Sequence, residues 1–272
     1  MRSLPYYGGK SAYSVRGVGP WVAAQIPWQH DTVYVEPFAG MLGVLLQRQP
    51  VKNEIANDIN DRLVNWWRCV RDYPEEFARL IAFTPVSRTE CHWAWDNLDN
   101  PALPPLRRAL AYHVVLDCGY TKSDGEGNGF YRELSVTSKD DRLLFGNARA
   151  LALARRLESV QLDNTCALTL LERTAGLPHA VIYADPPYLT GSNTPYLHDG
   201  VSAHALADAL LAQQGRVALS GNAGDWDDYL PGWHTSLYST HRHNYLGSGV
   251  ATVTPRTECL WTNYPPLQPR LL

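Results

Sequence analysis

The sequence lacks the features that mark membrane, secreted and disulfide-bonded proteins. No apolar run approaches the roughly 18 residues that a membrane-spanning helix needs. The first residues contain no apolar segment of the kind found in secretory signals, so no such signal is expected. Cysteine is scarce: the five residues are widely spaced, and no C-x-x-C pair occurs. These absences argue against a disulfide scaffold, a zinc cluster and a membrane partner, and they predict a cytoplasmic protein.

Several motifs of nucleotide-dependent and metal-dependent proteins are also missing. There is no G-x-G-x-x-G, which disfavours NAD, and no G-x-x-x-x-G-K-[ST] loop that would indicate an NTPase. Neither H-E-x-x-H nor H-x-x-x-H occurs, so no metal is expected. With 24 basic and 27 acidic residues, the net charge is −3, and the chain lacks the positive charge of proteins that coat nucleic acids. A local basic surface is still compatible with this charge.

What is present is the composition of a globular protein. The chain has 272 residues, of which 45% are hydrophobic and 19% charged, enough for one large or two small domains. Nine tryptophans and fifteen tyrosines are many for this length. They serve either packing or stacking on bases, and composition alone favours packing.

Short apolar runs alternate with helical patterns at both ends of the chain, and a helical block interrupts them. The pattern predicts an α/β fold with a doubly wound, mostly parallel sheet and an inserted, mainly helical subdomain. We place the sheet domain at residues 1–60 and 159–272 and the insert at residues 61–158. The expected strands are 33–36, 54–58, 160–162, 180–184 and 215–221, with a hairpin over 234–262 that turns at 247–249. The expected helices are 42–48, 61–72, 105–118, 140–157 and 202–214, with loops at 3–20 and 119–131.

The segment after the first expected strand has the character of a ligand-binding turn. It reads EPFAGMLG, with Gly40 and Gly43 at a strand-to-helix turn where a Cβ would block a ligand's approach to the backbone. Asp58 ends the next strand, twenty-two residues after Glu36. A carboxylate at this place is suited to accept hydrogen bonds from ribose hydroxyls.

The most informative segment is AVIYADPPYL (residues 180–189), where an apolar strand runs into Asp185, Pro186, Pro187 and Tyr188. In open α/β sheets, ligands bind beyond the carboxyl ends of the strands, where Asp185 is expected. The two prolines remove donors and fix the backbone. One interpretation is a rigid turn with a capping aspartate. The other is a pair of acceptors, the Asp185 carboxylate and the Pro186 carbonyl, that hold an amino group while Tyr188 stacks on a flat ring.

Six motifs in this order resemble the Dam-like, alpha-group DNA adenine N6-methyltransferases. They are YYGGK (6–10), EPFAG (36–40), NDIN (57–60), DPPY (185–188), ALSGN (218–222) and RTECLWTNYP (256–265). The resemblance implies a Rossmann-like methyltransferase sheet, with target recognition in the insert 61–158. It also implies methyl transfer from S-adenosylmethionine to adenine N6 of double-stranded DNA after base flipping, with S-adenosylhomocysteine as product. A monomer is expected, of the kind used in restriction–modification, in a bacterial cytoplasm or encoded by a phage and active in its host's cytoplasm.

The resemblance also implies roles for individual residues. The catalytic set is Asp185, Pro186, Pro187 and Tyr188. The cofactor-binding set is Tyr7, Lys10, Glu36, Pro37, Phe38, Ala39, Gly40, Asp58, Ile59, Asn164, Cys166 and Asp185. This sequence departs from the family at Leu42, where the family often has glycine or another small residue. It also has Cys166 where the family usually carries an acidic residue that touches the cofactor's adenine.

Four basic residues are candidates for DNA contacts. Arg242 and Arg256 lie in a stretch, residues 229–257, that has no acidic residue, which suits phosphate binding; a solvated hairpin face is the alternative. Lys122 and Arg132 lie in or next to the glycine-rich segment 119–131 of the insert.

Other functions stay open at this point. One is methyl transfer to another planar nitrogen, such as cytosine N4, an RNA adenine or a protein glutamine amide. Another is an inactive DNA-binding regulator. Asp185 and the motif order favour DNA adenine, and the absence of any Pro-Cys pair argues against a C5-cytosine enzyme.

Overall fold

A single seven-stranded sheet organises the molecule. The computed structural model describes residues 17–118, 147–189, 201–245 and 251–267. The sheet has the order β3-β2-β1-β4-β5-β7-β6. The strands are β1 (Val33–Glu36), β2 (Asn53–Asn57), β3 (Val160–Asp163), β4 (Ala180–Ala184), β5 (Arg216–Asn222), β6 (His234–Tyr245) and β7 (Ala251–Thr262). Strands β1 to β5 pair in parallel, and β7 pairs antiparallel with both β5 and β6. The predicted Rossmann-like α/β fold is confirmed.

The strand order reverses between β1 and β4. Val33 at the start of β1 lies opposite Asn53 of β2 on one side and opposite Ala180 of β4 on the other. The three strands therefore run in step, and their carboxyl ends meet at one edge of the sheet. In sheets of this kind, the crevice beyond that edge, at the point where the order reverses, is where ligands bind.

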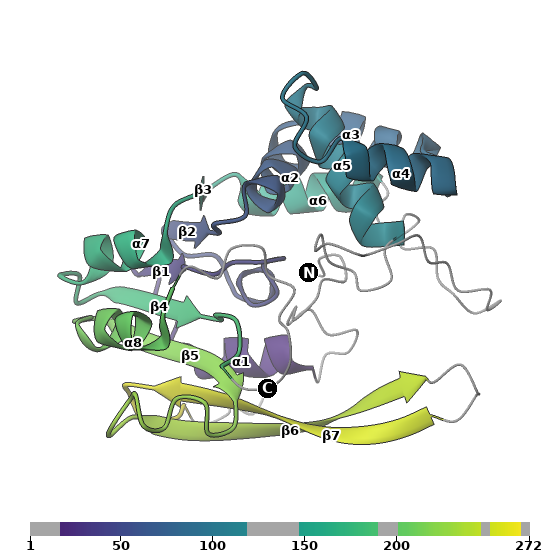
Figure 1. Cartoon of the computed structure of the whole chain (residues 1–272). Helices are drawn as coiled ribbons and strands as arrows, with labels where there is room; N and C mark the ends of the chain where they lie inside the picture. Colours follow the sequence, from purple (N-terminus) through teal and green to yellow (C-terminus); the bar gives the residue numbers. More distant parts are fainter. Residues whose placement is uncertain (1–16, 119–146, 190–200, 246–250, 268–272) are drawn as a thin grey trace.

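Helices account for most of the remaining described chain. They are α1 (Val18–Gln25), the 3₁₀ helix η1 (Leu45–Gln47), α2 (Asp61–Asp72), α3 (Pro74–Phe83), α4 (Arg88–Asp96), α5 (Pro105–Cys118), α6 (Asn147–Leu157), α7 (Ala167–Thr174) and α8 (Ala203–Leu211). Helices α2 to α6 fall between β2 and β3 in sequence and form a block at one end of the sheet, whereas α7 and α8 lie together beside β4 and β5 (Figure 1). Helix α6 is described only from residue 147.

The two faces of the sheet carry separate cores because successive strand residues point to opposite sides. On one face, Val35 and Ile182 pack in the cluster that contains α7 and α8. On the other, Tyr34 and Val181 join α1, η1 and the helical block in a larger cluster. All residues of β4 are buried, which explains its unbroken apolar sequence.

Helix α2 shows how a local pattern sets an element's limits. The Asn60 side chain accepts hydrogen bonds from the backbone N–H groups of Arg62 and Leu63 and so caps the helix, which begins at the predicted residue 61. Its buried residues recur at helical spacing and include Trp66 and Trp67. Residues 61–72 and 105–118 are helical as predicted.

A buried ion pair fastens the helical block to the sheet. The guanidinium of Arg156 in α6 donates to both carboxylate oxygens of Glu54 in β2, at 2.5 and 2.9 Å, and to the Leu45 carbonyl at 3.0 Å. The Glu54 side chain is fully buried. Loss of either charge would leave the other uncompensated in the core, which typically costs about 3–5 kcal/mol.

Two predictions of secondary structure were wrong, and one helix was missed. The expected loop over 3–20 ends in helix α1, which begins at Val18. The expected helix over 42–48 is only the 3₁₀ turn η1, because Leu42 has a positive φ of 54°, which no right-handed helix accommodates. Helix α7 was not predicted. The expected loop 119–131, the turn 247–249 and the start of the helix 140–157 lie outside the described residues.

The predicted division into a catalytic domain and a target-recognition insert stays a prediction, since only the helical character of the residues between β2 and β3 is observed. In the part of the chain that the structure describes, every helix is too short or too polar to cross a bilayer.

Candidate active site

The turn after β1 is bound tightly to the strand beside it. Gly40 has a φ of +49°, in the left-handed region, and its N–H donates to Asp58 Oδ2 at 2.9 Å. The Ala39 N–H donates to the carbonyl of Asn57 at 2.8 Å, and the indole of Trp67 in α2 donates to the Gly40 carbonyl at 3.0 Å. Among the described residues, no atom lies within 4 Å of the place where a Cβ on Gly40 would be. Glycine is therefore needed here for its conformation and not for space among these residues.

Asp58 is half-buried and serves the fold with both of its oxygens. Oδ2 accepts the Gly40 N–H, and Oδ1 accepts the N–H of Asn60 at 3.0 Å. These two hydrogen bonds hold the carboxylate in place.

Three more predicted cofactor residues lie in the segments after β2 and β3. The Asn164 amide, after β3, donates to the carbonyls of Asp58 and Ile59 at 2.8 and 3.0 Å. The Ile59 side chain is 45% exposed, which is high for an isoleucine, and Cys166 is exposed at the start of α7. Polar and apolar groups therefore both lie at the surface near the Asp58 carboxylate.

Asn57 ties three strand ends together, a role that sequence reasoning did not assign. Its side chain is fully buried and donates to the carbonyls of Pro37 and Thr165 at 2.9 and 3.0 Å. Its side-chain oxygen accepts the Thr165 N–H at 2.9 Å. These bonds link the exits of β1, β2 and β3. Asn57 is the first residue of the NDIN motif, but nothing in that motif indicates these contacts.

Asp185 is held by a chain of hydroxyl groups. The hydroxyl of Ser220, fully buried in β5, donates to Asp185 Oδ1 at 2.9 Å. Tyr183 lies 2.8 Å from the same hydroxyl oxygen and supplies the hydrogen of that bond, since the Ser220 hydrogen is directed at the carboxylate. Burial, and next the charge of Asp185, raise the pKa of Tyr183, so its phenol keeps its proton. The chain fixes one oxygen of a half-buried Asp185.

The residues after Asp185 are supported from β7 and from the turn that follows β5. Pro186 is buried, and Pro187 and Tyr188 are half-buried. The Tyr188 hydroxyl donates to Glu258 of β7, at 3.0 and 3.1 Å from the two carboxylate oxygens. The N–H of Leu189 donates to Asp225 at 3.3 Å. Sequence reasoning assigned no role to Ser220, Glu258 or Asp225.

Glu36 lies inside the fold beneath this edge. It is 1% exposed, and the Tyr34 hydroxyl donates to its Oε1 at 2.6 Å. Burial raises the pKa of Glu36 from 4.5 to about 8, against the opposing effects of the Tyr34 hydrogen bond and the Arg48 charge; Asp185 adds to the rise. Glu36 ends β1, the strand that pairs with the strand β4 leading into Asp185.

The other predicted site residues divide into three groups. Pro37 and Ala39 are buried, and Phe38 is half-buried against the core beside α7. Arg242 and Arg256 lie in β6 and β7. Tyr7, Lys10, Lys122 and Arg132 lie outside the described residues.

The hairpin of β6 and β7 extends past the sheet at the same edge. The pairing of β5 with β7 ends where Asn222 meets Glu258, while β6 and β7 stay paired as far as Tyr245 and Ala251. At about 3.4 Å per residue, the extension is roughly 20 Å long, and it projects beyond the tips of β4 and β5 (Figure 1). In this hairpin Arg242 pairs with Thr254, and Arg256 pairs with Thr240.

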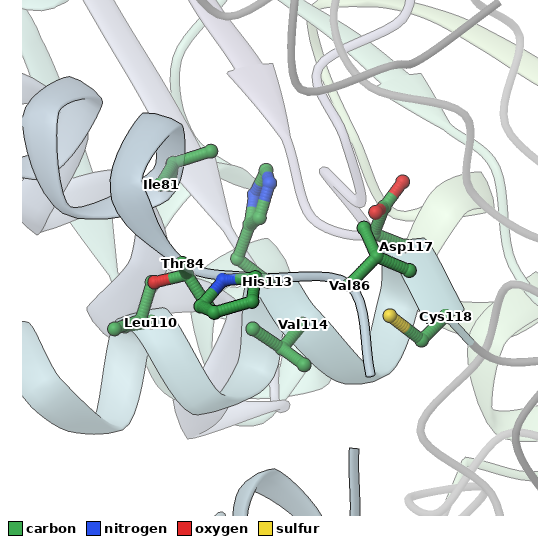
Figure 2. Close-up of a pocket in the computed structure, with 9 residues that line it drawn as sticks. Ile81, Thr84, Val86, Leu110, His113, Val114, Asp117 and Cys118 are labelled. Atoms are coloured by element: carbon green, nitrogen blue, oxygen red, sulfur yellow. The ribbon is translucent and has the colours of Figure 1, made fainter. Parts of the chain in front are cut away.

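A small cavity lies elsewhere, in the helical block (Figure 2). It is lined mainly by apolar residues of α3, α5 and the segment after α3, with His113 among them. The ring of His113 stacks on Trp66, with 6.3 Å between ring centroids and 5° between planes. None of the predicted site residues lines the cavity, so we treat it as a packing feature of the block.

Comparison with known families bears on the glycine turn and its surroundings. Residues 6–86 match the family model of the D12 class of N6 adenine-specific DNA methyltransferases. The resemblance to Dam-like enzymes is confirmed. The match includes the motifs at 6–10, 36–40 and 57–60, whereas DPPY (185–188) lies outside it. It supports a methyltransferase, and members of such families generally use S-adenosylmethionine.

Solved structures show more distant similarity. A precorrin-8w decarboxylase from Methanobacterium thermoautotrophicum is 11% identical, with a TM-score of 0.42 over 96% of this chain and 98% of that chain. A precorrin-6y C5,15-methyltransferase from Geobacter metallireducens is 10% identical, with a TM-score of 0.39 over 90% of this chain and 85% of that chain. No curated protein sequence matches the chain. Similarity at this level does not extend to substrate or mechanism.

The described residues fit S-adenosylmethionine. The part of the chain that the structure describes leaves room for a ligand beside the Gly40 backbone, and a carboxylate such as Asp58, fixed by two backbone N–H groups, suits ribose hydroxyls. The exposed Ile59 offers an apolar surface to an adenine ring.

Proposed function

We propose that this protein transfers a methyl group from S-adenosylmethionine to N6 of an adenine at a specific site in double-stranded DNA. The observation that carries the proposal is the placement of Asp185. It follows β4, the neighbour of β1 and its glycine turn, at the point where the strand order reverses, and Ser220 of β5 on the other side of β4 fixes its carboxylate.

The spacing of the strands supports one continuous site. Strand β1 separates β2 from β4, and neighbouring strands are about 4.8 Å apart, so the strands that end at Asp58 and Asp185 are roughly 10 Å apart. A nucleoside bound at Asp58 can therefore extend its reactive end toward Asp185. Glu36, which ends the strand β1 between them, has its pKa raised mainly by burial and in small part by the charge of Asp185.

The chemistry asks little of the protein except hydrogen-bond acceptors and alignment. Bound S-adenosylmethionine supplies an electrophilic methyl group on a positively charged sulfur. The lone pair of adenine N6 is delocalised into the ring, so the amine is a poor nucleophile. Asp185 and the Pro186 carbonyl accept its two N–H bonds, favour a tetrahedral nitrogen and stabilise the positive charge that develops there. As the N–C bond forms, the methyl–sulfur bond breaks and sulfur becomes neutral, and the methylated nitrogen then loses one of its two protons to solvent. Alignment of the reacting atoms contributes roughly 7–11 kcal/mol in favourable cases.

The Ser220 hydrogen bond makes Asp185 a better acceptor for this purpose. It holds Oδ1 and so fixes the rotation of the carboxylate. Because the group is planar, the direction of Oδ2 is then fixed as well. A carboxylate that is already oriented needs no rearrangement as the amine arrives, which is the basis of electrostatic preorganisation.

A base inside a duplex cannot reach such a site, so the target adenine is flipped out. Tyr188 stacks on the extruded ring and replaces part of the lost stacking, worth about 1–3 kcal/mol per base. The DNA lies against the hairpin that carries Arg242 and Arg256. The insert 61–158, which includes Lys122 and Arg132, reads the target sequence. The protein acts as a monomer in a bacterial cytoplasm.

Expression in a bacterial host without adenine methylation tests the proposal. Single-molecule sequencing of the host DNA should find N6-methyladenine in one sequence context, and the same host with an empty vector should have none. N4-methylcytosine in its place would move the reaction to another nitrogen. Unmodified DNA from cells that contain folded protein would favour an RNA substrate or an inactive regulator and would contradict the proposal.

A further inference from the structure

We propose that Glu258 is a positioning residue that sets the plane of the Tyr188 ring before a flipped base arrives. The inference rests on the proposed function and adds a residue to its site. It starts from one contact: the Tyr188 hydroxyl lies 3.0 Å from Glu258 Oε1 and 3.1 Å from Oε2. The hydroxyl is thus centred on the carboxylate.

The support for Glu258 is rigid. It lies in β7, opposite Asn222 of β5 and opposite Tyr238 of β6, so strands pair with it on both sides. Its side chain is 1% exposed. Tyr238 also packs against Trp21 of α1, with 5.3 Å between the ring centroids. A carboxylate in this position moves little.

Tyr188 is then held at both of its ends. Its backbone follows two prolines, whose φ angles are fixed by their rings. The next residue, Leu189, donates its N–H to the buried Asp225. The hydroxyl is held by Glu258, and a tyrosine side chain has only two rotatable bonds between these ends. The direction in which the ring presents its flat face follows from these restraints.

The choice of residue at position 258 argues for a purpose beyond stability. The next three residues of β7, Cys259, Leu260 and Trp261, are buried and apolar. A buried carboxylate costs free energy unless it is hydrogen-bonded, and an apolar residue would serve packing at lower cost. A carboxylate acceptor gives a stronger and more directional bond to a phenol than a neutral acceptor does. The presence of a carboxylate at position 258 is therefore explained by its bond to the Tyr188 hydroxyl, which orients the Tyr188 ring.

The experiment measures methyl incorporation from labelled S-adenosylmethionine into unmethylated bacterial DNA, which needs no knowledge of the target sequence. Four variants are compared with the parent: Glu258→Leu, Glu258→Gln, Tyr188→Phe and the double variant Glu258→Leu with Tyr188→Phe. Thermal unfolding and cofactor binding by calorimetry accompany each variant. Asp227→Asn is the matched control, because Asp227 accepts a hydrogen bond from Trp261 of the same strand and has no contact with Tyr188 among those that the structure describes.

We expect Tyr188→Phe and Glu258→Leu each to lower kcat/KM for DNA by about tenfold, the value of one hydrogen bond to a charged group. The double variant should be no slower than the slower single variant, since both remove the same contact. Glu258→Gln keeps an acceptor and should recover most of the loss. Cofactor affinity should match the parent in all of them, and Asp227→Asn should retain the parent rate.

Two results would overturn the inference. One is parent activity in Glu258→Leu. The other is losses that multiply in the double variant, which would show that Glu258 acts independently of Tyr188. If Glu258→Leu does not fold, Tyr188→Phe and Glu258→Gln decide the matter: parent activity in Tyr188→Phe removes the basis of the proposal. If the parent itself transfers no methyl group to DNA, the proposed function fails and the inference falls with it.

Discussion

The backbone N–H of Gly40 donates to Asp58 Oδ2 at 2.9 Å, and this bond joins the turn after β1 to the end of β2. The carboxylate that is expected to receive the ribose therefore also holds the glycine turn in place. The other oxygen of this carboxylate, Oδ1, accepts the N–H of Asn60, the residue that precedes α2. A substitution of Asp58 is therefore expected to change both cofactor binding and the stability of the fold.

Replacement of Asp58 by alanine should weaken S-adenosylmethionine binding by about ten- to a hundredfold, since hydrogen bonds to a charged group contribute about 1.5–3 kcal/mol. It should also lower the free energy of unfolding, because two backbone N–H groups lose their acceptor. Calorimetric titration with the cofactor and urea unfolding measure the two effects. Glu172→Gln, an exposed change on α7, is the control. Cofactor affinity equal to that of the parent would reject the ribose role.

Leu42 combines full burial with a φ of 54°, a conformation that favours glycine. Leu42→Ala should destabilise the protein by about 2–5 kcal/mol through loss of core contacts. Leu42→Gly should be the more stable of the two variants by about 0.5–1 kcal/mol, since glycine removes the backbone strain. Urea unfolding of both variants tests this order. Greater stability of the alanine variant would show that the strain is absent.

Glu36 should make stability depend on pH. Its pKa of about 8 in the folded protein lies above the ordinary value of 4.5, so the folded state keeps a proton that the unfolded chain releases. The contribution is complete below the lower value and is lost as the pH rises, by about 1.4 kcal/mol per pH unit across this window. Glu36→Gln cannot titrate. The free energy of unfolding of the parent should therefore fall relative to this variant between pH 5 and 8, and a constant difference would be inconsistent with a buried, protonated Glu36.

Arg242 and Arg256 lie on the hairpin that extends beyond the sheet. If they contact phosphates, the double variant Arg242→Ala with Arg256→Ala should bind DNA more weakly and with a flatter salt dependence, by about 0.9 in log–log slope for each lost contact. Arg216→Ala, at the opposite end of β5, is the matched control. Fluorescence anisotropy at several salt concentrations gives the slopes. A slope identical to that of the parent would leave the hairpin a solvated surface.

The strands and the first helix of the block could be predicted because their patterns are local. The apolar run before Asp185 and the helical spacing in 61–72 correspond to β4 and α2. Helix α7 has the same kind of signal, with buried Ala167, Leu170, Leu171 and Thr174 at helical spacing, so it was predictable from the sequence although it was not predicted.

The supporting contacts of the site could not be predicted in this way. Glu258 is 70 residues from Tyr188, and Ser220 is 35 residues from Asp185, so only the folded sheet brings them together. Leu42 is a different case. The departure from the family's small residue was visible in the sequence, yet its positive φ is a property of the turn.

The most direct test of the account is the rate of methyl transfer to DNA by Asp185→Ala in a single turnover, with enzyme and cofactor in excess. The account predicts a loss of about 100- to 1000-fold, comparable with the removal of one preorganised group from other active sites, while calorimetry finds the cofactor affinity of the parent. Transfer at the parent rate would show that Asp185 does not hold the reacting amine and would contradict the assignment of this edge of the sheet as the active site.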